Sequence, residues 1–275
     1  MSSLVVDTNL SAISAYNALS ATDQNMSKAI QQLSTGLSVQ TAADGPAAYV
    51  QSQALESQSN GYQAAISNAQ NGISLVQTAS GALNQISSIL QTMNQLAMDS
   101  ANGATQDSTS LAANQQEFSA LQADINQIAN TTSYGTTNLL DGNFTNQSLQ
   151  VGAFDTATNR ITVSISGATA SDLSVSSVSV DSATNAQAAL SAVQAAITQV
   201  DTIEASVGAV QNELQAMAAN LTVGQQNLSA ANSQLTNVNM AQEMTTFSTD
   251  QILMQTGTSM LAQAQQAPQL VLKLI

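Results

Sequence analysis

The stretch VQAAITQVDTIEASVGAVQNELQAMAANLTVGQQNLSAANSQL (residues 193–235) decides the fold, because an apolar side chain returns in it every seven residues. A second apolar row lies three or four residues behind the first, which is the pattern of a coiled-coil helix. The first row is Val193, Val200, Val207, Leu214, Leu221, Leu228 and Leu235. We therefore predict one long helix here, starting near Asp181 or Thr184.

The N-terminal half carries a matching pattern, which predicts a helix over 57–102 and a shorter one over 108–130. Gly103 separates the two. The seven-residue row of the longer helix is Ala69, Val76, Leu83, Leu90 and Ala97. These rows are also what the core faces of an ordinary helical bundle would show.

Both ends of the chain repeat the pattern, although terminal segments are usually polar and frayed. We expect a helix at each end, with the two apolar seams packed against each other. The seam residues are Ala12, Leu19, Met26 and Leu33 near the N-terminus, and Met240, Phe247, Met254 and Leu261 near the C-terminus.

The pattern of apolar and polar residues changes between the two halves of the chain. Residues 148–166 alternate between apolar and polar side chains, which predicts a β-hairpin with its loop at 153–159. Residues 167–181 are rich in Ser and predict an irregular strand or a flexible surface loop. The expected fold is mainly α, a long antiparallel helical coiled coil or bundle from both chain ends with a small β-hairpin insert.

Composition excludes several classes of protein. Three basic residues against 17 acidic ones give a net charge of −14, which argues against nucleic acid and against an anionic membrane surface. No apolar run reaches the roughly 20 residues of a membrane-spanning helix, and the N-terminus lacks the basic region of a cleaved signal. We expect no membrane insertion.

The chain contains no Cys and no His, which removes disulfides, thiolate or imidazole metal ligands and Ser/His or Cys/His nucleophiles. Its carboxylates are scattered, and no phosphate loop, dinucleotide fingerprint or calcium loop is present. We expect no catalytic, cofactor-binding or metal site, so the chain is not expected to be an enzyme.

These motifs together resemble bacterial flagellin over essentially the whole chain. The stretch AIQQLSTGLSVQTAADGPAAYV (29–50) is similar to the family's signature near the N-terminus. The long helical stretch at 68–102, the hairpin entry TTSYGTTNLLDGNFTNQSLQVGA (131–153) and VDTIEASVGAVQNELQ (200–215) match further parts of that family. The most specific match is QILMQTGTSMLAQAQQAPQLVLKLI (251–275).

The resemblance implies a division of the chain into six parts. Terminal coiled-coil helices would occupy 1–42 and 236–275, with a spoke loop at 43–56. Rod helices would occupy 57–133 and 182–235, and 134–181 would hold the hairpin and a short Ser-rich surface insert. Val76, Leu83, Leu90, Val193, Val200, Val207, Leu214, Leu221 and Leu228 would form the rod core, and the terminal seams would drive assembly.

The function implied by the resemblance is a structural subunit that assembles head-to-tail into the flagellar filament for swimming motility. Its terminal helices would become ordered on polymerisation. The location would be secreted and extracellular, in the filament, after type III export. Implied partners are further copies of the chain, an export chaperone, and the cap and hook-associated proteins.

The chain departs from the family pattern in places. Thr92, Asn94 and Gln95 stand where flagellins usually carry Arg and Glu, so recognition by an innate immune receptor is not carried over. Asp44 is expected to lack the basic partner that the family's spoke loop provides. The final residue, Ile275, stands where Arg is common.

Two other functions stay open from the sequence. A hook–filament junction protein shares the terminal helices, but its central region is usually more elaborate. A secreted binding module or immune ligand is a different class, which binding to a receptor ectodomain would distinguish.

Overall fold

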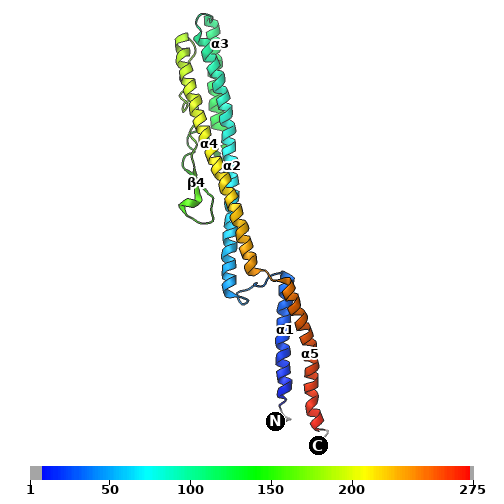
Figure 1. Cartoon of the computed structure of the whole chain (residues 1–275). Helices are drawn as coiled ribbons and strands as arrows, with labels where there is room; N and C mark the ends of the chain where they lie inside the picture. The colour runs from blue at the N-terminus through cyan, green and yellow to red at the C-terminus, as the bar shows by residue number, and fades with distance from the viewer. Residues whose placement is uncertain (1–7, 273–275) are drawn as a thin grey trace. The chain divides into compact units, whose positions relative to one another are not determined.

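The computed structural model describes residues 8–272 and divides into two compact units (Figure 1). One unit is Ser57–Asn227, and the other is built from the two ends of the chain, Met1–Glu56 and Leu228–Ile275. The helices are α1 (Leu10–Thr35), α2 (Pro46–Ala101), α3 (Ser108–Thr131), α4 (Ala183–Thr236) and α5 (Met240–Leu272). The predicted mainly helical fold with a small β insert is confirmed. Residues 1–7 and 273–275 of the expected terminal helices lie outside the described residues.

The helix boundaries near the N-terminus differ from those expected. The first helix stops at Thr35 and not at 42, because Gly36 takes a left-handed conformation (φ +75°) and donates its N–H to the Gln32 carbonyl at 2.8 Å. That is the usual way for glycine to end a helix. The expected loop over 43–56 is wrong in extent, since α2 already begins at Pro46. Proline suits the first helical position, where its missing N–H costs nothing.

Helices α2, α3 and α4 of the 57–227 unit share a large hydrophobic core, and a smaller cluster of Ala65, Ile66 and Leu221 lies between α2 and α4. Gly72 of α2 lets two side chains come close, since a Cβ placed there would lie 2.7 Å from the Leu149 side chain, in the segment after α3, and 3.1 Å from that of Leu214 on α4. The structure buries Val76, Leu83, Leu90, Val193, Val200, Val207, Leu214 and Leu221. Leu228, the last of the expected rod-core residues, is half-buried and belongs to the other unit.

Two small antiparallel strand pairs lie between α3 and α4. Strands β3 (Gln147–Gln150) and β4 (Arg160–Val163) form the predicted hairpin, with Leu149 opposite Ile161. A short 3₁₀ turn, η1 (Ala157–Asn159), lies in its loop. The pair β1 (Ser133–Tyr134) and β2 (Thr137–Asn138) was not expected. Each of these strands has only two residues, which is too short for an alternation of apolar and polar side chains to show in the sequence.

The Ser-rich segment over 167–181 contains no strand, so the expectation of an irregular strand was wrong, and the segment is an irregular loop with one side on the surface. Its small and apolar side chains are buried in the core of the unit: Ala168, Ala170, Leu173, Val175 and Val180. Such burial removes backbone groups from water, and each of them then needs a hydrogen-bond partner.

Side-chain amides on α3 supply those partners. The Gln122 Nε2 group donates to the carbonyls of Val175 at 2.6 Å and Val178 at 3.0 Å. The Asn126 amide oxygen accepts from the Ala170 N–H at 2.9 Å. Helix α3 therefore holds this segment in the way that a neighbouring strand would in a sheet.

Replacing Gln122 with Ala should destabilise the Ser57–Asn227 unit by about 1–3 kcal/mol, because two carbonyls lose their donor. Urea unfolding monitored by circular dichroism would measure the change. The matched control is Gln127→Ala, since Gln127 is an exposed glutamine on the same helix. Equal stability of the two variants would contradict the role of Gln122.

Candidate functional site: the paired terminal helices

Helices α1 and α5 lie side by side and run in opposite directions (Figure 1). Asn9 caps α1, because its side-chain oxygen accepts from the Ala12 N–H at 3.1 Å. The Asn9 Nδ2 group also donates to the Ala264 carbonyl on α5 at 2.7 Å. One side chain thus starts α1 and joins it to the other end of the chain.

The register of the pair follows from Gly257 and Leu19. A Cβ placed on Gly257 would lie 3.1 Å from Leu19 Cδ1, so the two helices pass close to each other here. Moving seven residues along each helix, in opposite directions, places Ala12 at the level of Ala264 and Met26 at the level of Asp250. The same register places Ala15 near Leu261.

All eight predicted seam residues lie on this helix pair, and their burial is uneven. Seven of them are half-buried: Ala12, Leu19, Met26, Leu33, Phe247, Met254 and Leu261. Met240 is exposed, with 48% of its surface accessible. The seams therefore contact each other without closing into a fully buried core.

Sequence reasoning missed the small and polar half of the seam. Ala29 is the most buried residue of α1, and Gly257 and Asp250 occupy corresponding positions on α5. Large side chains on one helix face small ones on the other, so the small partners carry no hydropathy signal of their own. Each of them lies three residues after a member of the apolar row, and the row repeats every seven residues. That spacing could have located them.

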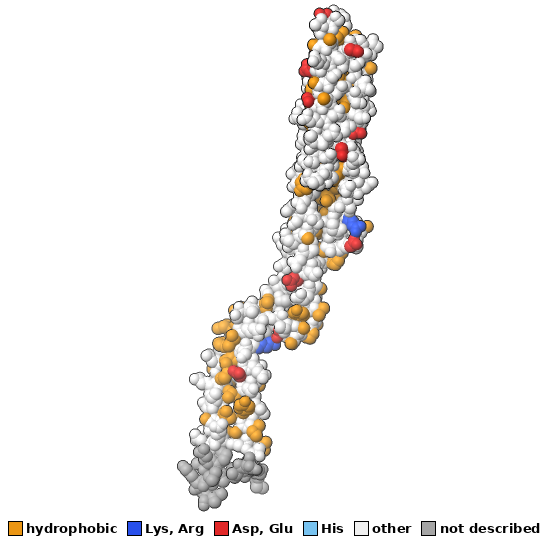
Figure 2. All heavy atoms as spheres, turned by 180° about the vertical axis from the view of Figure 1, so that it is seen from behind, with side chains coloured by type: hydrophobic (Ala, Val, Ile, Leu, Met, Phe, Trp, Pro, Cys, Tyr) orange, Lys and Arg blue, Asp and Glu red, His pale blue; other side chains and the backbone are white. Residues whose placement is uncertain are grey.

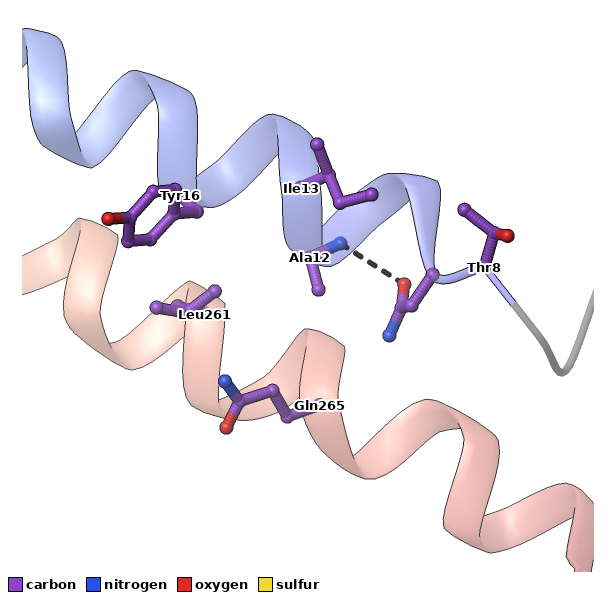
Figure 3. Close-up of a pocket in the computed structure, with 7 residues that line it drawn as sticks. Thr8, Ala12, Ile13, Tyr16, Leu261 and Gln265 are labelled. Atoms are coloured by element: carbon purple, nitrogen blue, oxygen red, sulfur yellow. Dashed lines mark hydrogen bonds between the residues drawn. The ribbon is translucent and has the colours of Figure 1, made fainter.

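A groove of about 380 Å³ lies between the start of α1 and the last turns of α5 (Figure 3). Ala12 and Leu261 line it together with the exposed side chains of Ile13 and Tyr16. Tyr16 and Leu261 come from opposite helices, as Figure 3 shows. The groove is shallow and mostly apolar, which suits another protein surface better than a small substrate.

Exposed apolar side chains gather on the terminal unit. Of the fourteen large apolar residues that are exposed in the described part of the chain, ten belong to this unit. They are Leu10, Ile13, Tyr16, Ile30, Val50, Met240, Met244, Ile252, Leu253 and Met260. Figure 2 shows hydrophobic side chains over the terminal helices, with few charged ones among them. Apolar surface of this kind marks a site of protein association.

Many of the polar residues on the same helices direct their hydroxyls back onto their own backbone. On α5, Thr245, Thr246, Ser248 and Thr249 each donate to the carbonyl four residues earlier, at 2.8–3.2 Å. A hydroxyl bonded in this way is less available to water or to a new partner.

The loop over 36–45 is bonded to the joint between α4 and α5. The Ser38 N–H donates to the Thr236 carbonyl at 2.6 Å, and the Val238 N–H donates to the Gly36 carbonyl at 2.9 Å. These bonds connect the link that follows α1 with the link that precedes α5, so both helices leave the same short junction.

Asp44 organises this loop, and the expectation that it lacks a basic partner was wrong. Lys28 Nζ lies 3.2 Å from the Asp44 carboxylate. About two turns of α1 and a returning loop bring them together, which linear spacing does not reveal. The N–H and hydroxyl of Thr41 lower the pKa of Asp44 most, Lys28 adds to this, and the pKa falls to about 2.

Within the described residues, no three metal-ligating side chains gather. Of the helices in residues 8–272, none has the length and hydropathy that a membrane crossing needs. The arrangement defines a structural helical protein whose two chain ends pair and present apolar surface.

Comparison with known families identifies which structural protein this is. The family described as the bacterial flagellin N-terminal helical region matches residues 6–145, and the flagellin C-terminal helical region matches residues 190–275. The chain belongs to the bacterial flagellin family and is a structural subunit of the flagellar filament.

Individual relatives agree over the full length. A flagellin of Halalkalibacterium halodurans is 35% identical over 272 residues, which cover 99% of this chain and 100% of the relative. A flagellin of Bacillus subtilis is 36% identical over 303 residues, which cover 98% and 99% of the two chains.

Among solved structures, a Bacillus cereus flagellin covers 60% of this chain and 94% of its own at 25% identity, with a TM-score of 0.50. A putative flagellar hook-associated protein of Vibrio parahaemolyticus covers 70% of this chain and 100% of its own, with a TM-score of 0.58. Its 15% identity shows a shared fold and nothing more. The hook–filament junction alternative is therefore not better supported than flagellin.

The Asp44 carboxylate should titrate near pH 2, below its ordinary value of 3.8. A depressed folded-state pKa means that the loop gains stability from Asp44 above about pH 4 and loses it as the pH falls toward about 2. The amide shifts of Gln40 and Thr41 in NMR spectra would report this titration, since both N–H groups donate to Asp44.

Lys28→Met should raise the titration midpoint, whereas Lys28→Arg should keep it low because the positive charge remains. Asp44→Asn should abolish the transition in both amides. A wild-type midpoint at the ordinary value for Asp would refute the proposed bonding.

Proposed function

We propose that this filament subunit assembles head-to-tail through its paired terminal helices, which gain their stable order when further copies pack on them. The apolar surface of the terminal unit carries this proposal. An isolated helix gains little stability by itself and depends on the burial of its apolar face. Ten exposed large apolar side chains on one unit leave much of that burial unfinished in a single chain.

Open polymerisation follows when one surface of a subunit fits a different surface of the next and the rotation between them does not close a ring. In this proposal, α1 (Leu10–Thr35) and α5 (Met240–Leu272) form the inner coiled coil, with the loop at 36–45 as the connecting spoke. Residues 57–133 and 182–235 form the rod, and 134–181 form the hairpin and a compact surface insert. The flagellar filament 33 kDa core protein of Treponema phagedenis, 33% identical over 296 residues, supports a core role in a filament.

Contacts between copies should depend on apolar packing and amide hydrogen bonds more than on ion pairs. The chain has only three Lys and Arg residues. Within one chain, Lys28 pairs with Asp44 and Arg160 pairs with Asp155. Two of the three cations therefore already have a partner before any second copy arrives.

The remaining roles rest on family membership. We propose that the chain is exported through the flagellar type III apparatus, functions outside the cell, and has no enzymatic activity. An export chaperone, the cap and the hook-associated proteins are the proposed partners besides the chain itself. Thr92, Asn94 and Gln95 replace the usual charged side chains, so recognition by an innate immune receptor does not belong to the proposal.

Removal of about 20 residues from either end should abolish polymerisation and leave a soluble helical subunit, because the helix pair loses one partner. Negative-stain imaging after salt-induced polymerisation would show filaments for the full chain only. Filaments from either truncated chain would rule out a role for the terminal pair. Short assemblies that the full chain cannot extend would favour the junction-protein alternative.

A single substitution tests the pairing more sharply. Gly257→Val should prevent polymerisation, since a branched side chain cannot occupy the space that Leu19 fills. The matched control is Gly81→Val, because a Cβ at Gly81 meets no atom within 4 Å. Valine is at least as good a helix former as glycine, so a loss specific to Gly257→Val reports the helix contact. Normal filaments from Gly257→Val would show that α1 and α5 need not pack this closely.

A further inference from the structure

Asp250 is a carboxylate buried in the seam between α1 and α5. Only 8% of its surface is exposed, and its Oδ2 atom is enclosed without a hydrogen-bond partner among the described residues. Phe247 and Met254 lie three residues before it and four residues after it, and therefore on the same face of α5. The register places Met26 of α1 at the same level. The carboxylate thus stands in an otherwise apolar layer.

Three threonine hydroxyls on the neighbouring turns of the two helices donate to backbone carbonyls and not to this carboxylate. Thr246 and Thr249, on the preceding turn of α5, donate to the carbonyls of Gln242 and Thr245. Thr22 of α1 donates to the Ala18 carbonyl at 3.0 Å.

No cation within the described part of the terminal helices is free to neutralise Asp250. Lys28 is the single Lys or Arg there, and it pairs with Asp44 at 3.2 Å. A carboxylate with one enclosed oxygen that accepts no hydrogen bond opposes the packing that encloses it, because the lost hydration of that oxygen is not replaced.

We infer that Asp250 is a built-in destabilising residue that keeps α1 and α5 of a single subunit short of stable pairing, so that stable pairing requires contact with further copies. The link to further copies rests on the proposed function, whereas the effect on pairing does not. The apolar layers at Leu19 and Phe247 favour closure, and the Asp250 layer opposes it. In the proposed filament, apolar burial against neighbouring copies would offset this opposition.

Two other carboxylates in the terminal helices show why position matters. Glu243 occupies the corresponding seam position one heptad earlier, but it lies in the first turn of α5 and is half-buried. A carboxylate at a helix N-terminus is favoured by the helix dipole. Asp23 of α1 is exposed to water. Asp250 alone combines a mid-helix position with burial, so removing its charge should have the largest effect.

The test compares Asp250→Asn, which keeps the shape and removes the charge, with the matched control Asp23→Asn. Hydrogen exchange of the unpolymerised subunit, read by mass spectrometry on peptides from α1 and α5, measures pairing directly. We expect Asp250→Asn to raise the hydrogen-exchange protection of both helices by at least about tenfold. An unpaired buried charge lowers the equilibrium constant for pairing by more than about that factor. Asp23→Asn should leave protection unchanged. Asp250→Leu provides a second variant, in case an amide in the seam is itself poorly satisfied.

Polymerisation provides an independent readout. Both Asp250 variants should polymerise at a lower critical concentration than the wild type. If neither variant raises protection, the inference is overturned. If they weaken filaments, a donor from a second copy binds Asp250, and the inference is overturned as well. Raised protection in a protein that never polymerises, wild type included, would uphold the role of Asp250 in pairing and refute the proposed function instead.

Discussion

The antiparallel contact between α1 and α5 is the constraint on which the terminal unit depends. It joins segments more than 250 residues apart, as the bond from Asn9 to Ala264 shows. The contact consists of half-buried side chains and a junction of backbone bonds at Gly36, Ser38 and Thr236. Such a helix pair can have one fixed register and still be weakly stable. A subunit whose terminal helices gain further stability from neighbouring copies needs a pair of this kind.

Periodicity predicted most of this molecule, and its omissions have physical causes. Rows such as Val76 to Leu90 and Val193 to Leu221 are visible because large apolar residues repeat over several turns. Where the core is made of small residues the signal fails, as with Ala29 and Gly257. It also fails where polar side chains replace a sheet partner, as Gln122 does for the segment after β4. The Lys28–Asp44 pair was missed because a loop, and not a helix spacing, brings the two charges together.

The scarcity of charge gives each remaining charge more weight. In a chain with many cations, a buried carboxylate could find a partner by small movements of a long side chain. Here Lys28 is already held by Asp44, and the Asp250 carboxylate has an enclosed oxygen that accepts no bond from residues 8–272. Stability and assembly are therefore separable in principle: apolar layers determine which surfaces meet, and one unpaired charge determines how readily they meet within a single chain.

The hydroxyls that α5 turns onto its own carbonyls bear on hydration. Thr245, Thr246, Ser248 and Thr249 have exchanged a water molecule for a backbone oxygen before any partner arrives. A neighbour that packs over them removes fewer bound waters than it would from free hydroxyls or from charged groups, so less of the association energy is lost to dehydration. The hydroxyls that lie among the exposed apolar side chains of α5 therefore oppose burial less than free hydroxyls would, so this helix can present apolar and polar groups together to a neighbouring copy.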